Sequence, residues 1–495
     1  MHLFAHIGDT INKNHNRNVF LINGITYTYL DFAKAISKIR WAIQTGTGAN
    51  ENILGVVAND DIETYAAIFA LWLEGKAYVP LEPNMPRSRN ENIIQQAFIE
   101  TIIDSSAEPL LDNCKLIASK KLAATAIGVA PKEVSDKDLA YILFTSGTTG
   151  QPKGVPITRA NLAGFVTAFD ALGFDISEND RCLQMFELTF DLSVMSYLIP
   201  ILKGACIYTI PKNSIKYLYI YELMEEQQLT VALMVPSILQ NLRSYFNEIE
   251  LGNMRYSLFC GEALAEDVTA AWSKCVPNAV ICNVYGPTED TIFCTCYTYN
   301  KTSYNKSYNG LLSVGKAMQG SFTIIVDEQN NVLPFDNTGE LCLGGIQLTP
   351  GYWNNAEKNK EAFFIADYNG KKERFYKTGD ICRMDAGGDI LYTGRLDYQI
   401  KVQGFRVELS EIEFHARSFL KNINAVAVAI TNSGNTEIGL VIESKAFDSI
   451  PVCNYMKAKM PVYMIPKQVL FIESFPLNVN GKTDRNKLRE LFKQL

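Results

Sequence analysis

Several residue types and patterns are scarce in this sequence of 495 residues. It has four histidines, and three of them, His2, His6 and His15, lie close to the N-terminus. A Ser-His-Asp hydrolase or a histidine-rich metal site is therefore difficult to build, because both need imidazole groups at their centre. The eleven cysteines form no Cys-x-x-Cys pair and lie in apolar, strand-like runs. This placement indicates buried, reduced thiols rather than zinc ligands or disulfides.

Charge and hydropathy exclude further classes of protein. The net charge is −7 and no basic stripe is present, which argues against a nucleic-acid partner. No apolar run reaches the roughly 18 residues that a membrane-spanning helix needs, so we expect no membrane insertion. The N-terminus lacks the basic-then-apolar layout of a signal peptide, and the expected location is cytoplasmic.

The order of apolar patterns predicts the fold class. Up to about residue 135, and again over about 180–285, strand-like runs alternate with amphipathic helical patterns. This alternation is typical of an α/β fold with mixed, mostly parallel sheets flanked by helices. From about residue 310 to 396, frequent glycines and short strands predict a small β-rich subdomain. From Lys401 onward we expect a compact α+β tail.

A loop rich in glycine and hydroxyl residues lies within "YILFTSGTTGQPKGVPIT", from Tyr141 to Thr158. Its small residues allow backbone N–H groups to approach phosphate oxygens, and its hydroxyls and Lys153 add donors. It is not a Walker loop, because Pro152 precedes the lysine and Pro156 delays any helix until about Thr158. The sequence predicts a flap over the distal phosphates of a nucleotide; the alternative is a glycine-rich surface turn.

Asp191 lies within an apolar stretch, "FELTFDLSVMSYLIPIL". A carboxylate in such a place is costly unless it meets a cation, which suggests a counter-ion for the ammonium group of a substrate. The alternative is an ordinary helix N-cap, because a helical pattern follows directly.

Two further motifs suit a nucleotide. In "NVYGPTEDT", Tyr285 offers a flat face for adenine, Thr288 can hydrogen-bond a phosphate and Glu289 can hold Mg²⁺. In "FYKTGDICR", Asp380 can accept both hydroxyls of a ribose. Each has an ordinary alternative, a strand-to-turn connection for the first motif and a turn aspartate for the second.

Together, "TSGTTGQPKG", "NVYGPTEDT", "YTGRLDYQIKVQGFRVE" and "PLNVNGKTDRNKL" resemble the motifs of the adenylate-forming superfamily, which contains acyl-CoA synthetases, luciferases and amino-acid adenylation domains. The resemblance covers residues 141 to 487 in the family's order. It implies an N-terminal core over residues 1–396, hinged at Asp397 to a mobile C-terminal domain over residues 397–495. It also implies ATP and Mg²⁺, the metal on Glu289, and these ATP-binding residues: Thr145, Ser146, Gly147, Thr148, Thr149, Lys153, Asn283, Val284, Tyr285, Gly286, Pro287, Thr288, Asp380, Tyr392, Arg395 and Lys482.

The resemblance also implies the reaction. Lys482, in an Asn-Gly turn, would bridge the substrate carboxylate and the α-phosphate, with Thr288 and Glu289 as the other catalytic residues. Without the resemblance, Lys482 is interpreted as an ordinary exposed lysine in a turn. Swinging of the C-terminal domain would then present the Lys401–Gly404 side to a phosphopantetheine thiol. Thirteen residues follow Lys482, so we expect the carrier protein to be a separate chain.

Offsets from the motifs predict the substrate pocket: Asp191, Leu192, Met195, Leu233, Leu258, Cys260, Val284, Ile292, Phe293 and Lys482. These mostly apolar side chains favour a small amino acid. "FDLSVM" and "LFCGE" resemble D-alanine–D-alanyl carrier protein ligases, in which a cysteine matching Cys260 favours the D-enantiomer. Leu233, Val284 and Phe293 depart from that pattern. Another small amino acid, an acyl-CoA ligase and a non-catalytic adenylate-binding protein remain alternatives.

Overall fold

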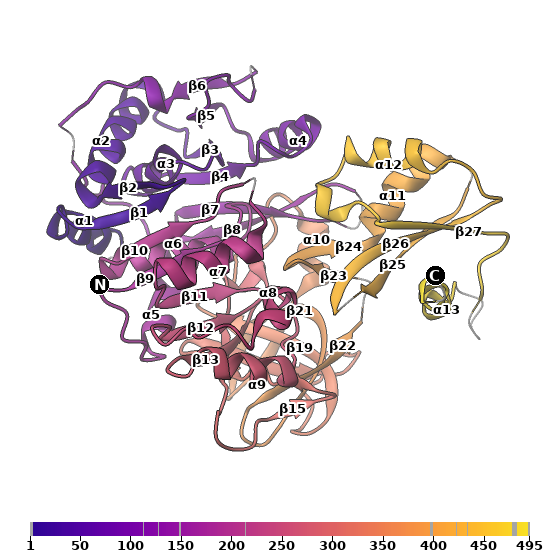
Figure 1. The fold of residues 1–495 in the computed structure, drawn as a ribbon. Helices are drawn as coiled ribbons and strands as arrows, with labels where there is room; N and C mark the ends of the chain where they lie inside the picture. The colour runs from indigo at the N-terminus through magenta and orange to yellow at the C-terminus, as the bar shows by residue number, and fades with distance from the viewer. Residues whose placement is uncertain are drawn as a thin grey trace. The chain divides into compact units, whose positions relative to one another are not determined.

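The computed structural model describes residues 3–111, 113–126, 128–147, 150–212, 214–396, 399–421, 423–432, 434–477 and 483–493. Four predicted site residues, Thr148, Thr149, Asp397 and Lys482, lie outside these ranges. The chain divides into two compact units (Figure 1). Unit 1 contains residues 1–83, 94–143 and 154–396, and unit 2 contains residues 84–93, 144–153 and 397–495. Residues 84–93 and 144–153, within the range expected for the core, therefore pack with the C-terminal part. The functional division at 396/397 stays a prediction.

A nine-stranded sheet is the largest element of unit 1, with the order β17-β14-β13-β12-β11-β9-β10-β1-β2. Its pairs from β1 to β13 through β10, β9, β11 and β12 are parallel, and β2, β14 and β17 are antiparallel additions at the two edges. Its strands are β1 (Asn18–Ile22), β2 (Ile25–Thr28), β9 (Arg181–Gln184), β10 (Cys206–Thr209), β11 (Val231–Met234), β12 (Tyr256–Phe259), β13 (Val280–Tyr285), β14 (Thr295–Thr298) and β17 (Lys316–Ala317).

A second sheet has the order β6-β5-β3-β4-β7-β8, from strands β3 (Ile53–Val57), β4 (Ala77–Leu81), β5 (Thr101–Asp104), β6 (Lys115–Ala118), β7 (Leu139–Thr145) and β8 (Lys153–Thr158). Helix α6 (Leu192–Lys203) connects the two sheets. It packs on β9 and β10, and its Tyr197 hydroxyl lies 2.8 Å from the hydroxyl of Tyr78 on β4. The predicted α/β class with mostly parallel sheets is confirmed.

Two helices of unit 1 begin at a capping box. Thr28 and Asp31 form a capping box at the start of α2 (Tyr29–Gly46), and Thr158 and Asn161 form another at the start of α5 (Arg159–Asp170). No helix follows the glycine-rich loop directly, because β8 lies between them, as the prolines predict. The other helices of at least seven residues up to residue 396 are α1 (Leu3–Lys13), α3 (Ile62–Leu73), α4 (Arg87–Ala97), α7 (Lys216–Glu226), α8 (Pro236–Leu242), α9 (Glu266–Cys275) and α10 (Ala356–Ala362).

The β-rich part of unit 1 is an antiparallel sheet in the order β18-β19-β21-β20, with β22 also paired to β21. Its strands are β18 (Ser321–Val326), β19 (Thr338–Gly345), β20 (Phe363–Tyr368), β21 (Lys371–Met384) and β22 (Ile390–Arg395); the pair β15 (Ser307–Tyr308) and β16 (Leu311–Leu312) precedes them. The expectation of uniformly short strands is wrong for β21, which has 14 residues. Asp380 therefore lies within a strand and not in a turn.

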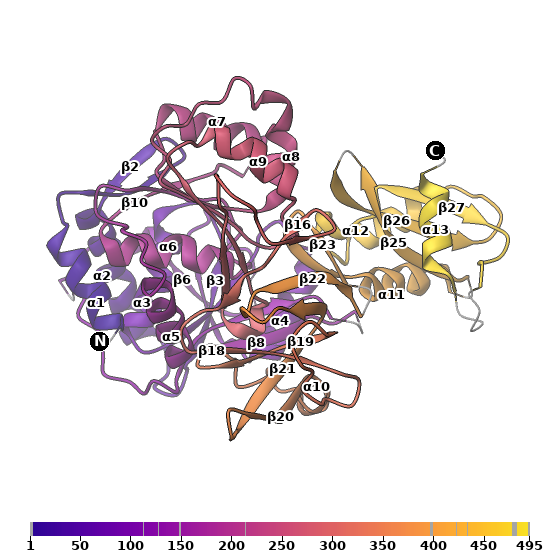
Figure 2. The ribbon, with the colours of Figure 1, turned by 90° about the horizontal axis from the view of Figure 1, so that it is seen from below.

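Unit 2 contains the hairpin β23 (Gln399–Val402) and β24 (Phe405–Glu408) and the sheet β25 (Ala425–Asn432), β26 (Asn435–Glu443) and β27 (Gln468–Ile472). Helices α11 (Leu409–Leu420) and α12 (Ile450–Lys457) pack against each other, and α11 and α13 (Arg485–Phe492) both pack on β25 (Figure 2). Ala425 and Ala427 belong to the core with α11, whereas Val426 and Val428 belong to the core with α13. The alternation along β25 therefore buries both faces of the sheet.

Two general expectations can be checked on the described residues. All eleven cysteines are free thiols; seven are buried, as predicted, whereas Cys114, Cys206, Cys296 and Cys453 are half-buried. A helix with the length and apolar character needed to cross a bilayer is not found among the described parts of the chain.

Candidate functional site

Parallel strands β11, β12 and β13 form one wall of the predicted pocket. Leu233 on β11 lies opposite Leu258 on β12, which lies opposite Cys282 on β13. Since side chains alternate along a strand, Cys260 and Val284 share this face of the sheet. All five side chains are buried. The wall is therefore continuous and apolar, apart from two thiols.

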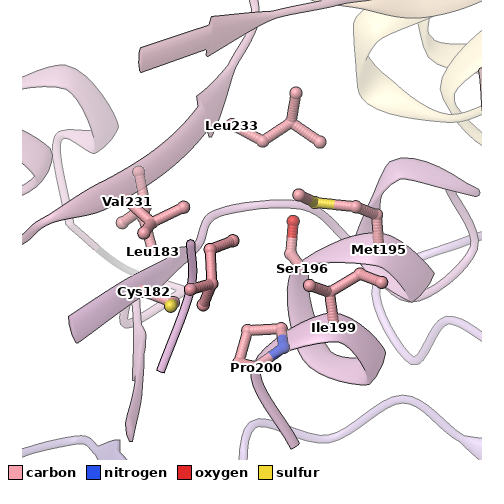
Figure 3. A pocket seen from close by; sticks show the side chains of 9 residues that line it. Cys182, Leu183, Met195, Ser196, Ile199, Pro200, Val231 and Leu233 are labelled. Carbon is pink, nitrogen blue, oxygen red and sulfur yellow. The ribbon is translucent and has the colours of Figure 1, made fainter. Parts of the chain in front are cut away.

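Helix α6 lies across from this wall. Met195 on α6 and Leu233 on β11 line a common cavity of about 10 Å³, which is room for about one water molecule. Figure 3 shows that its side chains come from strands β9 and β11 and from α6. The residues around it are Ile176, Cys182, Leu183, Met195, Ser196, Ile199, Pro200, Val231 and Leu233. Packing leaves little space beyond Met195 and Leu233.

Asp191 precedes the first residue of α6 and is 4% exposed. Among the described residues, its side chain accepts no capping hydrogen bond from the helix, so the N-cap alternative does not account for this carboxylate. Burial raises the pKa of Tyr78 and Tyr141, and the negative charge of Asp191 raises both further. The carboxylate therefore faces a deeply buried, low-dielectric environment, in which a cation would be strongly attracted.

A second group of predicted residues meets where the ends of β13, at Tyr285, and of β22, at Arg395, contact Asp380 within β21. The hydroxyl of Tyr285 donates a hydrogen bond to Asp380 Oδ2 at 2.5 Å, and Arg395 contacts Asp380 Oδ1 at 2.5 Å. Burial, followed by the charge of Asp380, raises the pKa of Tyr285. Tyr285 and Tyr392 pack on the same apolar cluster. Three residues predicted to hold a nucleoside thus lie together, with the carboxylate as the shared acceptor.

The turn after β13, residues 286–294, is called the pocket turn below. A Cβ at Gly286 would lie 2.4 Å from the Cα of Phe293, so only glycine fits there. Ile292 is fully buried. The ring of Phe293 lies edge-on to Phe165 of α5, with 5.0 Å between the ring centroids. Phe293 is therefore held against α5, a contact that the sequence offsets do not predict.

Glu289, in the same turn, is fully buried, and its Oε1 accepts a 2.6 Å hydrogen bond from the hydroxyl of Tyr352. Magnesium ions are commonly bound by one or two carboxylates together with substrate phosphates, and a single oriented carboxylate fits that role. No group of three or more His, Cys, Asp or Glu side chains with metal-ligand spacing is present in the described ranges. The residues therefore fit a cation shared with a phosphate better than a site built only from protein.

Asp290, next to Glu289, was not predicted as a site residue. It is fully buried, and neither carboxylate oxygen meets a nitrogen or oxygen donor among the described residues. Burial raises its pKa to about 7; the Cys294 thiol lowers it and the charge of Glu289 raises it. Below about pH 7 the folded protein therefore favours the neutral carboxylic acid.

The glycine-rich loop belongs to unit 2. The Ser146 hydroxyl donates to the Arg406 carbonyl at 2.8 Å, and the Gly147 N–H donates to Glu411 Oε2 at 3.2 Å. Lys153 lies 3.9 Å from Glu408. A Cβ at Gly147 would lie 2.1 Å from the Gln151 carbonyl oxygen, so this tight turn requires glycine.

At the start of this loop, the Thr145 hydroxyl is buried with no partner in the described parts of the chain. An unpaired buried hydroxyl offers a donor to an anion such as a phosphate.

The other predicted residues that the structure describes are buried or hydrogen-bonded within the protein. The Asn283 side chain donates to the Ser313 carbonyl at 2.9 Å, Thr288 is 9% exposed and Leu192 is 1% exposed. Thr148, Thr149, Asp397 and Lys482 cannot be placed, since they lie outside the described residues. Their roles, like those of the other site residues, stay predictions.

Sequence reasoning missed Tyr352, Gln347 and Glu411. Tyr352 and Glu289 are 63 positions apart, and Gln347 bonds to residues 54 to 57 positions away. Contacts at such separations leave no periodic pattern. A tyrosine or glutamine in a Gly-rich, apolar segment gives only the weak signal that a buried polar group needs partners.

Comparison with known proteins places this geometry in context. The sequence profile described as "AMP-binding enzyme" matches residues 9–353. Tyrocidine synthase 1 of Brevibacillus parabrevis is 28% identical over 482 residues, which are 95% of this chain and 43% of that protein. The chain therefore spans less than half the length of this curated relative.

Two solved structures have the same fold. The Vibrio cholerae adenylation domain AlmE, in complex with glycyl-adenosine-5'-phosphate, has a TM-score of 0.84 at 24% identity, with 100% of this chain and 98% of that one covered. PA1221, an NRPS protein containing adenylation and PCP domains, has a TM-score of 0.85 at 23% identity, with 98% and 83% covered.

Proposed function

Because the chain belongs to the AMP-binding enzyme family, we propose that it activates a small amino acid with ATP. The products of the first step are an aminoacyl-AMP and pyrophosphate. In the second step the aminoacyl group passes to the phosphopantetheine thiol of a separate carrier protein. D-alanine is the favoured substrate, and the expected location is cytoplasmic.

The observation that carries this proposal is the burial of Asp191. Its carboxylate is buried at the start of α6, and its charge acts on the buried hydroxyls of Tyr78 and Tyr141. A buried acid of this kind is stabilised by a cationic partner, and an amino acid supplies one in its ammonium group. A fatty acid or an aryl acid has no such group, which favours an amino acid over an acyl-CoA ligase substrate.

In the first step, an oxygen of the amino-acid carboxylate attacks the α-phosphorus of ATP, and the bond from that phosphorus to the bridging oxygen breaks. Pyrophosphate takes the electron pair. Two anions must approach each other, so positive charge at the α-phosphate lowers the barrier. Lys482 would supply this charge and hold the carboxylate, while Asp191 holds the ammonium group and fixes the direction of attack.

Other residues hold the nucleotide. Asp380 would accept the ribose hydroxyls, Tyr285 would face the adenine, and the loop with Ser146 and Lys153 would cover the leaving pyrophosphate. Glu289 would hold Mg²⁺, which when bound supplies charge neutralisation at the phosphates. The Tyr352 hydroxyl keeps the Glu289 carboxylate oriented.

In the second step, a thiolate attacks the carbonyl carbon of the aminoacyl-AMP, and AMP leaves with the electron pair of the broken C–O bond. The thioester stays on the carrier. PA1221, which contains adenylation and PCP domains, supports a carrier as the acceptor here. Delivery of this carrier as a separate chain is part of the proposal.

Packing supports a small side chain on the substrate. The cavity that Met195 and Leu233 help to line has only about 10 Å³, and Cys260, in the wall of the predicted pocket, is 2% exposed. Glycine is the second candidate, because AlmE was crystallised with glycyl-adenosine-5'-phosphate. A use in nonribosomal peptide synthesis follows from the same chemistry, with a different carrier.

ATP–pyrophosphate exchange tests the proposal directly. The purified chain is assayed with D-Ala, L-Ala, Gly, L-Ser and L-Val, and with acetate and benzoate as acids without an ammonium group. Exchange is expected with one or more of the small amino acids, D-Ala first. Exchange only with acetate or benzoate would identify an acyl-CoA-type ligase, and no exchange with any acid would indicate a non-catalytic adenylate-binding protein.

A further inference from the structure

The pocket turn has an unusual backbone at its centre. Thr291 has a φ of +49° and Ile292 a φ of +76°. Left-handed backbone is unfavourable for β-branched residues, and two in succession are held only where surrounding contacts enforce them. The strained pair lies between Glu289, the proposed metal ligand, and Phe293, which is predicted to line the substrate pocket. The contacts that hold these two residues therefore also set the shape of the site.

One buried side chain supplies most of those contacts. The Nε2 of Gln347, which is fully buried, donates to the carbonyls of Phe293 at 2.9 Å and of Asp290 and Thr291 at 3.2 Å each. The Thr291 hydroxyl in turn donates to the backbone carbonyl of Gln347 at 2.5 Å. One amide group thus satisfies the carbonyls on both sides of the strained pair, where water has no access.

The segment that carries Gln347 is itself fixed. The Asn161 side chain of α5 donates to the carbonyls of Ile346 at 2.7 Å and Leu348 at 3.0 Å. The Thr349 N–H donates to the Glu289 carbonyl at 2.9 Å. Residues 346–349 therefore form a rigid support that contacts the pocket turn at Glu289, at the strained pair and at Phe293.

We infer that Gln347 is a positioning residue for substrate selection: its amide holds Ile292 and Phe293 in the wall that limits the size of the amino-acid side chain. This inference rests on the proposed function and extends it to a residue outside the predicted pocket. Its amide contacts the turn and is assigned no contact with the substrate. It acts by holding a strained turn that would otherwise relax and widen the pocket.

The test uses a variant of equal size without the donor, Gln347→Met, in the full-length chain. Exchange is measured with D-Ala or Gly and with the larger L-Val. The ratio of kcat/KM for the small substrate to that for L-Val is expected to fall about tenfold, a change typical of pocket contacts. KM for the amino acid should rise, while KM for ATP stays within about twofold.

Ser37→Ala is the control, because it removes a buried hydroxyl of α2 whose hydrogen bonds go to Thr125 and Gly128, and not to the support or the pocket turn. It should lower the melting temperature without changing the selectivity ratio. If Gln347→Met does not fold, Thr291→Val, which removes the hydroxyl donated to Gln347, should shift the ratio in the same direction by a smaller factor.

The outcomes separate the two claims. Exchange by the wild-type chain combined with an unchanged ratio in Gln347→Met, or in Thr291→Val where the former does not fold, overturns the role of Gln347 alone. An equal loss of selectivity in Ser37→Ala also overturns it. No exchange by the wild-type chain with any amino acid overturns the proposed function, and this inference with it.

Discussion

Asp290→Asn tests whether a buried acid makes the stability of this protein depend on pH. In the folded chain the pKa of Asp290 is raised from its usual 3.8 to about 7, chiefly by burial. In the unfolded chain the carboxyl group loses its proton near pH 4. Between these two values the folded state holds one more proton than the unfolded state, so stability must fall as pH rises.

The magnitude follows from the width of that window. Each unit of pKa difference corresponds to about 1.4 kcal/mol, so a shift of about three units destabilises the fold by about 4 kcal/mol above pH 7. Below pH 4 both states are protonated and the cost disappears. Asparagine has nearly the same shape but does not ionise, so the variant should lack this dependence.

Urea unfolding at pH 5, 6, 7 and 8 provides the measurement. The free energy of unfolding of Asp290→Asn relative to wild type should increase by about 3 kcal/mol from pH 5 to pH 8, with most of the change complete by pH 7. Asp9→Asn, at an exposed position, is the control and should leave the curve unchanged. Parallel pH curves for wild type and Asp290→Asn would refute the reasoning.

Three further predictions concern the site. Lys482→Ala should remove most ATP–pyrophosphate exchange while nucleotide binding, measured by calorimetry, survives; unchanged turnover would contradict its assigned role. Tyr352→Phe, which removes the hydroxyl bonded to Glu289, should lower kcat for exchange about tenfold and raise the Mg²⁺ concentration needed for half-maximal rate; a magnesium titration that matches wild type would argue against it. Met195→Ala should join the small cavity beside Leu233 to the pocket and raise kcat/KM for L-Val relative to D-Ala, measured by exchange; a lower ratio would show that the space collapses instead.

The sequence predicts the architecture well where short-range patterns decide it. Alternating strand and helix patterns indicate the parallel sheets, and the start of α6 directly after Asp191 follows from its apolar period. Pro156 correctly predicts that no helix begins before about Thr158; the strand β8 that fills this interval was not predicted. In each case neighbours within about four residues carry the signal.

Contacts between distant segments cannot be predicted from such local sequence patterns. Nothing near Gln347 indicates that its amide faces a turn more than fifty positions earlier, and nothing near Phe293 indicates that its ring packs on α5. The left-handed pair at Thr291 and Ile292 contradicts their local preference, because tertiary hydrogen bonds outweigh it. These features of the site depend on the assembled fold.

The contact between Gly147 and Glu411 affects how an anion can enter the glycine-rich loop. Glu411 is fully buried and also pairs with Arg89 at 2.7 Å, so its negative charge is compensated within the protein. An incoming phosphate that uses the Gly147 N–H must compete with a carboxylate that is already bound. If a phosphate uses the Gly147 N–H, as in the proposed function, its apparent affinity is lowered by the fraction of molecules in which Gly147 is bonded to Glu411.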